Sequence, residues 1–92
     1  MSEGMKVGSI FETEFGQLRQ VVEISTDYNG KVRVSYNSKS AKIAGRDFEP
    51  GHNKTNPPLD TTFKTESGRM LSDHEIRAYV ESGILEESEL IR

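Results

Sequence analysis

The chain has 92 residues, which matches one domain, because a single hydrophobic core usually serves about 50 to 200 residues. Hydrophobic residues make up 33% of the chain, and the formal net charge is -3. This charge has the wrong sign for a protein that acts mainly by neutralising phosphates. The absence of cysteine excludes disulfides, thiolate metal sites and thiol nucleophiles. Because no apolar run is long enough for a membrane span or a signal peptide, we expect a cytoplasmic protein without membrane contact.

The first half of the chain has the pattern of short strands separated by turns. We expect a first strand within residues 5–13, a reversal at Gly16, and a second strand over residues 17–25. A third strand is expected over residues 31–37, where apolar and polar side chains alternate. The Asn-Gly pair at residues 29–30 favours a two-residue type I′ turn, so the second and third strands should form a tight hairpin.

The alternation predicts which side chains of this hairpin share a face. Leu18 and Ile24 lie at even positions of the second strand and should face the same side, whereas Val21 should face the other. In the third strand, Val34 and Tyr36 share the apolar face. We therefore expect one buried and one polar face.

Residues 38–60 lack any apolar periodicity and are rich in glycine and proline, so we expect a long loop there. After this loop, the β-prone residues 61–65 predict a short strand with Phe63 pointing inward. The β-rich region would then cover residues 5–66.

The C-terminal third carries the signals of a helix over residues 73–82. Ser72 and Glu75 have the spacing of a capping box at its start, and Gly83 is placed to end it in the left-handed conformation. One face of this helix should carry its apolar stripe, which comprises Ile76, Tyr79 and Val80. The fold class we predict is α+β: a small antiparallel β-sheet or SH3-like open barrel with one C-terminal amphipathic helix.

Patterns that would carry catalysis or metal binding are missing from the sequence. His52 and His74 lack the spacing of a transition-metal site, and both should be exposed to solvent. Neither the nucleophile motif Gly-x-Ser-x-Gly nor a P-loop is present. We therefore expect no catalytic residue, no metal and no cofactor.

The distribution of charge favours a binding surface instead. Residues 37–60 carry four basic and three acidic residues, whereas residues 61–92 carry four basic and seven acidic ones. The loop could contact phosphate or an acidic protein face, and the acidic end could occupy a basic groove. An aromatic residue at a turn tip could anchor a partner. The candidate partner-binding residues are Tyr28, Lys39, Lys42, Arg46, Lys54, Glu86, Glu87 and Glu89.

The stretch from Val7 to Tyr36, which includes Val-Gly-Ser-Ile-Phe-Glu-Thr and Gly-Lys-Val-Arg-Val-Ser-Tyr, resembles small β-hairpin proteins encoded by bacteriophages and other mobile elements, several of which are anti-CRISPR proteins. The resemblance covers about a third of the chain and includes no diagnostic motif. It implies a non-catalytic inhibitor that docks on a host ribonucleoprotein complex, a CRISPR effector, in a bacterial cytoplasm and prevents engagement of target DNA. The slight net charge and basic loop favour a mixed-charge docking surface that also touches guide RNA over a pure DNA mimic.

Two alternatives from other classes stay open. The chain could be an SH3-like module that binds nucleic acid through Lys31, Arg33 and the basic loop, which a strong salt dependence of oligonucleotide binding would reveal. It could also be a small enzyme or metabolite-binding protein with the long loop as its lid, for which ligand-induced thermal shifts are the test.

Overall fold

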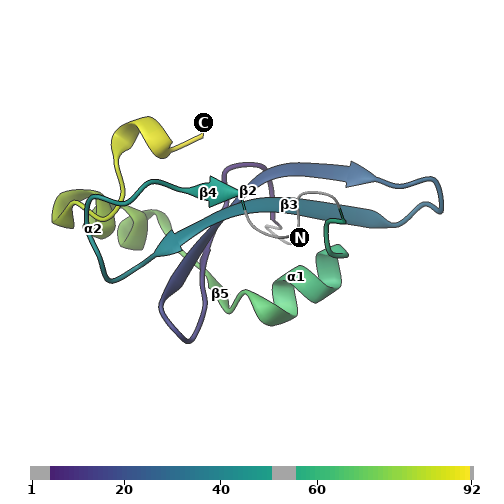
Figure 1. The fold of residues 1–92 in the computed structure, drawn as a ribbon, viewed down its shortest axis with the longest axis horizontal. Helices are drawn as coiled ribbons and strands as arrows, with labels where there is room; N and C mark the ends of the chain where they lie inside the picture. The colour runs from purple at the N-terminus through teal and green to yellow at the C-terminus, as the bar shows by residue number, and fades with distance from the viewer. Residues whose placement is uncertain (1–4, 51–55, 92) are drawn as a thin grey trace.

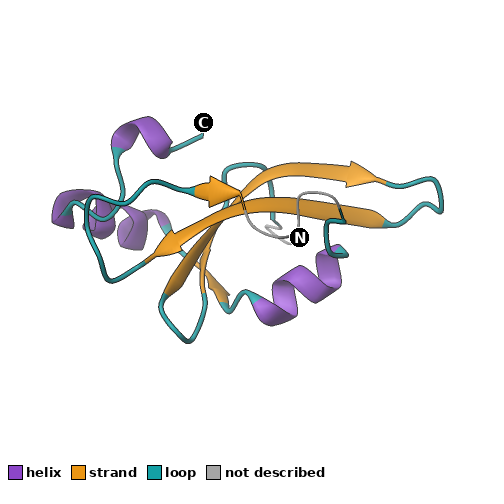
Figure 2. Ribbon diagram, in the orientation of Figure 1, coloured by secondary structure: helices purple, strands orange, loops and turns teal. Residues whose placement is uncertain are grey.

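The protein is described by a computed structural model that covers residues 5–50 and 56–91. This part of the chain forms one antiparallel sheet with the strand order β4-β3-β2-β1-β5. Helices lie on both sides of the sheet, as Figures 1 and 2 show. The elements in chain order are β1 (Ile10–Glu12), β2 (Gln17–Thr26), β3 (Val32–Ser40), β4 (Glu49–Pro50), α1 (Asp60–Glu66), β5 (Arg69–Met70), α2 (Asp73–Ser82) and the 3-10 turn η2 (Glu87–Glu89). The predicted α+β class is confirmed, with one helix more than expected.

The β2–β3 hairpin is the longest feature of the sheet, and it contains an irregularity that the alternation did not reveal. The register shifts between Val21 and Glu23, so Val22 is an extra residue in the ladder. This bulge moves Ile24 to the same side as Val21, while Leu18 packs on the opposite side. The prediction that Leu18 and Ile24 share a face is therefore wrong. Both faces of the sheet carry buried side chains.

The hairpin turn is longer than the predicted two-residue type I′ turn. Asp27 N donates to the carbonyl of Lys31 at 2.8 Å, and Gly30 N donates to the carbonyl of Asp27 at 2.9 Å. Gly30 has a φ of 81°, whereas no non-glycine residue in the described chain has a positive φ. Asn29 therefore does not adopt the conformation that a type I′ turn requires. The Asp27 carboxylate instead accepts the backbone N–H groups of Asn29 and Lys31, each at 2.9 Å.

Residues 60–66 form helix α1 and not the strand that we predicted for residues 61–65. Phe63 is nevertheless buried as expected. Its ring lies 5.0 Å from that of Phe11 in an edge-on arrangement and 5.1 Å from that of Tyr36. Aromatic packing of this kind adds to the area buried, so tertiary contact outweighs the strand propensity of the threonines.

Helix α2 agrees with its sequence signals at both ends. Ser72 and Glu75 form the capping box, and Gly83 is left-handed with a φ of 87°. The N–H of Ile84 donates to the carbonyl of Tyr79 at 3.0 Å, as in a Schellman motif. His74 on its outer face is exposed. None of the helices in residues 5–50 and 56–91 is long and apolar enough to cross a membrane.

The sheet therefore lies between two hydrophobic clusters. On one side, α2 and the C-terminal residues pack on a cluster of Ile10, Leu18, Ala41, Leu71 and Leu85. On the other side, α1 contributes Phe63 to a cluster with Phe11, Val21 and Val34. The predicted loop 38–60 is only partly a loop, because it includes the end of β3, all of β4 and the first residue of α1. Its described connecting part, residues 41–48, contributes Ala41 and Phe48 to the first cluster.

Candidate functional site

Lys39 lies on β3 with its side chain pointing toward the C-terminal residues, and only 1% of that side chain is exposed. Its ammonium group donates to Glu89 Oε1 at 2.7 Å and to the carbonyl of Arg46 at 3.0 Å. The ammonium also lies 4.8 Å from the centre of the Phe48 ring, within the range of a cation–π contact. Lys39 was expected to contact a partner, but its charge is already satisfied inside the molecule.

Two further hydrogen bonds hold the C-terminal turn η2 against the sheet. The Gln20 side-chain amide donates to the carbonyl of Glu89 at 2.7 Å. The N–H of Glu86 donates to the Glu89 carboxylate at 3.0 Å. Gln20 is itself buried, and this hydrogen bond satisfies its side-chain amide. Glu89 is thereby fixed by a strand, by a buried cation and by its own turn.

Lys39 brings the basic loop and the acidic end of the chain together, although they are far apart in the sequence. We use the name mixed-charge surface for the exposed charged residues of these two segments, Lys42, Arg46, Glu86 and Glu87, together with the partly buried Glu89; Glu87 is also ion-paired with Arg77. Five of the eight predicted contact residues thus belong to one region of the fold. The sequence suggested two surfaces of opposite sign, and the Lys39 contacts with Arg46 and Glu89 join them.

The side chain of Lys42 extends this surface toward the turn between β1 and β2. A Cβ placed on Gly16 would lie 2.5 Å from Lys42 Cε, so the lysine stem lies across the glycine. The N–H of Ala41 donates to the carbonyl of Gly16 at 2.8 Å, which fixes the loop there. Phe15, next in the turn, is 82% exposed. Phe15 was not among the predicted contacts, although it is, like Tyr28, an aromatic residue in a turn between two strands.

Tyr28 is 97% exposed, but it lies at the far end of the β2–β3 hairpin. Figure 1 shows this hairpin tip at the end of the molecule opposite to α2 and the C-terminal turn. A strand the length of β2 spans about 33 Å at about 3.3 Å per residue, so Tyr28 is separate from the mixed-charge surface. The predicted contact Lys54 and the histidine His52 lie outside the described residues.

The face proposed for nucleic-acid binding is partly occupied. The Arg33 guanidinium donates to the Asp27 carboxylate at 3.0 Å and to the carbonyl of Pro57 at 3.0 Å. The hydrogen bond from the N–H of Lys31, and second the one from Arg33, lower the pKa of Asp27. Lys31 itself is exposed. The Arg33 guanidinium therefore already has two acceptors within the protein, one of them in the hairpin turn.

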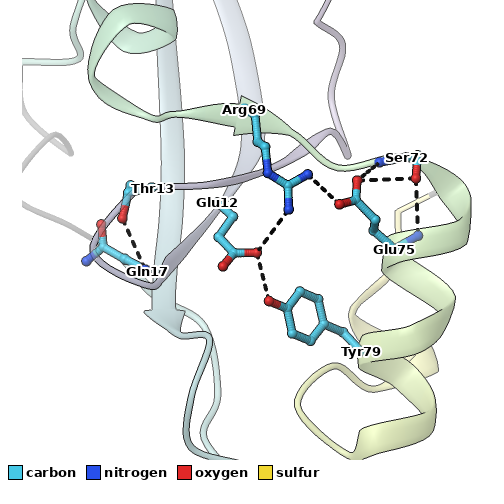
Figure 3. A network of polar contacts seen from close by, with 7 residues as sticks. All are labelled: Glu12, Thr13, Gln17, Arg69, Ser72, Glu75 and Tyr79. Carbon is cyan, nitrogen blue, oxygen red and sulfur yellow. Dashed lines mark hydrogen bonds and ion pairs between the residues drawn. The ribbon is translucent and has the colours of Figure 1, made fainter.

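A second polar cluster, drawn in Figure 3, joins β1, β5 and helix α2. The Tyr79 hydroxyl donates to Glu12 Oε1 at 2.7 Å, and Arg69 lies 3.9 Å from the same oxygen. Arg69 also pairs with Glu75 of the capping box. Burial and the Glu12 carboxylate raise the pKa of Tyr79 to about 12. Because this phenol holds its proton firmly, the cluster has the chemistry of a structural tie between helix and sheet.

In the described ranges, no group of three or more His, Asp or Glu side chains is placed to hold a metal ion. No protein-family model matches the chain, and neither does any curated protein or solved structure in the comparisons.

Proposed function

We propose that the protein is a non-catalytic inhibitor of the anti-CRISPR type, which docks on a CRISPR effector complex in the cytoplasm of a bacterial host. It acts by occupying the surface on which the effector engages target DNA. The mixed-charge surface makes the main contact, with Glu86 and Glu87 facing basic grooves of the effector and Lys42 and Arg46 facing acidic protein or guide RNA.

The observation that carries this proposal is the buried contact of Lys39 with Glu89. It fixes a basic and an acidic segment in one geometry before any partner arrives. A preorganised surface loses less conformational entropy on binding than a flexible one. Charge complementarity of both signs also selects one partner over others and speeds association. These properties suit a stoichiometric inhibitor.

The mixed sign of this surface favours a protein or ribonucleoprotein partner over bare nucleic acid. The exposed carboxylates of Glu86 and Glu87 would repel a phosphate backbone placed beside Arg46. The same carboxylates are an advantage against the basic groove of an effector, where nucleic acid would otherwise bind. The exposed Phe15 precedes Gly16, the residue that the Lys42 side chain covers, and it adds an aromatic side chain, a residue type that often dominates binding energy.

The experiment is a binding measurement between the purified chain and purified effector complexes of several CRISPR types, by biolayer interferometry. A double variant, Lys42→Glu with Arg46→Glu, reverses two exposed charges of the surface. A control variant, Lys31→Glu with Lys64→Glu, makes the same change of net charge at exposed positions elsewhere. We expect the first variant to lose at least about tenfold in affinity, or about 1.4 kcal/mol, and the control to bind like the unaltered chain.

Equal losses in both variants would show that only net charge matters and would contradict the proposal. Tight binding to a free oligonucleotide that weakens steeply with salt would instead support the nucleic-acid module. Absence of binding to every effector would reject the anti-CRISPR assignment.

A further inference from the structure

A groove of about 470 Å³ lies between the segment that leads into β1, the start of α2 and the C-terminal residues. Its volume is in the range of about 300 to 1,000 Å³ that is typical of small-molecule sites. Gly8 and Ile91 meet at the groove, because a Cβ on Gly8 would lie 2.8 Å from the carbonyl oxygen of Ile91. The lining is part polar and part apolar, and its apolar side chains include Ile10, Leu71, Ile76, Leu90 and Ile91.

Three charged side chains line the same groove: Lys6, Arg77 and Asp73. Arg77 donates to Glu87 at 2.7 Å, but both side chains of this pair are more than half exposed, and such pairs contribute little. A guanidinium has five N–H donors, so Arg77 retains donors for a second acceptor. Lys6 is exposed and has three donors of its own. With Glu87 counted, the two cations are balanced by two carboxylates, so a ligand anion would be held by the N–H donors of Lys6 and Arg77 and not by an excess of positive charge.

These features define the chemistry of a fitting ligand. An aliphatic chain would cover Ile76 and Leu90, and a carboxylate at its end would accept hydrogen bonds from Lys6 and Arg77. Asp73 would repel a second negative charge, which disfavours dicarboxylates and phosphates. We propose that this groove binds a small aliphatic monocarboxylate. The groove adjoins the mixed-charge surface at the Arg77–Glu87 pair, but this proposal does not rest on the proposed docking function.

The test is a titration of the ¹⁵N-labelled chain with sodium octanoate, kept below its micelle concentration and followed by NMR. We expect saturable shifts concentrated at the amides of the groove, such as Leu71 and Arg77. Lys6→Gln and Arg77→Gln should each weaken octanoate binding by about threefold to tenfold, in line with the loss of one charge-assisted hydrogen bond. Lys31→Gln, at an exposed position in the hairpin turn, should bind octanoate unchanged. Circular dichroism melting verifies that each variant is folded.

Three further probes separate the contributions of charge and chain. Octanol keeps the chain without the charge, octylammonium reverses the charge, and inorganic phosphate has charge without a chain. Each should bind at least about threefold more weakly than octanoate if chain and carboxylate both contribute. The proposal is overturned by octylammonium or octanol binding as tightly as octanoate, by shifts outside the groove, or by no saturable shift. Tighter binding of acetyl-Gly-Leu, whose carboxylate ends a peptide, would also overturn it, because the occupant would then be a chain terminus.

Discussion

Lys39 and Glu89 form an ion pair of 2.7 Å across 50 positions of sequence, and the lysine side chain is almost fully removed from solvent. The pair connects strand β3 to the last turn of the described chain. Because Lys39 also binds the carbonyl of Arg46, one ammonium group organises both parts of the mixed-charge surface. Stability and the proposed function therefore depend on the same residue.

Replacing Lys39 should reveal this dependence. Lys39→Met leaves the Glu89 carboxylate without its cation, and we expect a loss of about 3 kcal/mol in the free energy of unfolding, measured by urea denaturation. Adding Glu89→Gln removes the unpaired charge but keeps an oxygen for the N–H of Glu86, so the double variant should recover part of that loss. Lys64→Met, at an exposed site, should change stability by less than about 0.5 kcal/mol. A Lys39→Met variant as stable as the unaltered chain would show that the pair contributes nothing.

Two glycines offer a matched pair for testing the packing between β1 and β5. Gly68 has a φ of 82°, and a Cβ there would lie 2.1 Å from the carbonyl oxygen of Glu12. Gly30 has nearly the same φ of 81° but nothing within 4 Å. We expect Gly30→Ala to cost about 1–2 kcal/mol, the penalty for the left-handed conformation alone. Gly68→Ala should cost at least about 2 kcal/mol more, because the backbone must also move. Equal losses in thermal or urea unfolding would contradict the close approach.

Tyr79 should behave as a structural phenol with a late titration. Burial and Glu12 raise its pKa from the ordinary value of 10.0 to about 12. Because the folded pKa exceeds the unfolded one, the stabilisation from Tyr79 is complete below pH 10 and is lost as the pH rises toward 12. Tyr79→Phe should lower stability by about 1 kcal/mol at neutral pH and remove the last phase of the tyrosinate absorbance titration. If that last phase persists in Tyr79→Phe, another tyrosine is responsible for it.

At acidic pH, the free energy of unfolding should depend on two carboxylates, Glu75 at the start of α2 and Asp27 in the hairpin turn. The N–H of Ser72, and then Arg69, lower the pKa of Glu75 below its usual 4.5, and the N–H of Lys31 has the corresponding effect on Asp27. Groups with a lowered folded pKa stabilise the fold above the unfolded pKa, and this contribution is lost as the pH falls through the folded value. We therefore expect stability to decrease from about pH 5 to about pH 3. Glu75→Gln and Asp27→Asn should each flatten this decrease in urea unfolding; an unchanged slope would contradict the assignment.

Local signals predicted helix α2 well, because the residues of its capping box and Gly83 lie in the helix or directly beside it in the sequence. The same is true of the hairpin as a pairing of β2 with β3. Features that depend on contacts between residues far apart in the sequence could not be predicted in this way. The bulge at Val22 reverses the faces of β2 without any glycine or proline to mark it. Residues 61–65 have strand propensity but form α1, because Phe63 packs against Phe11 and Tyr36.

In the candidate site, too, local features were predicted and the contact between distant residues was not. Exposure was predicted correctly for Tyr28, Lys42 and Arg46, because loops and turns place charged and aromatic tips outside. Lys39 was expected at the surface, but its position on β3 opposite Leu18 directs it toward the hydrophobic cluster. A buried lysine requires a partner, and the chain supplies Glu89 from its far end. Sequence separation hides such a pairing, because nothing local distinguishes Glu89 from Glu86 or Glu87.

The most direct test of the proposed function is a plasmid interference assay in bacteria with active CRISPR immunity, using a panel of effector types. We predict that expression of the chain restores transformation by a targeted plasmid for at least one type. The Lys42→Glu with Arg46→Glu variant should lose this protection, whereas Lys31→Glu with Lys64→Glu should retain it. Interference unaffected by the chain in every type, or protection that persists after the charge reversal at Lys42 and Arg46, would contradict the account.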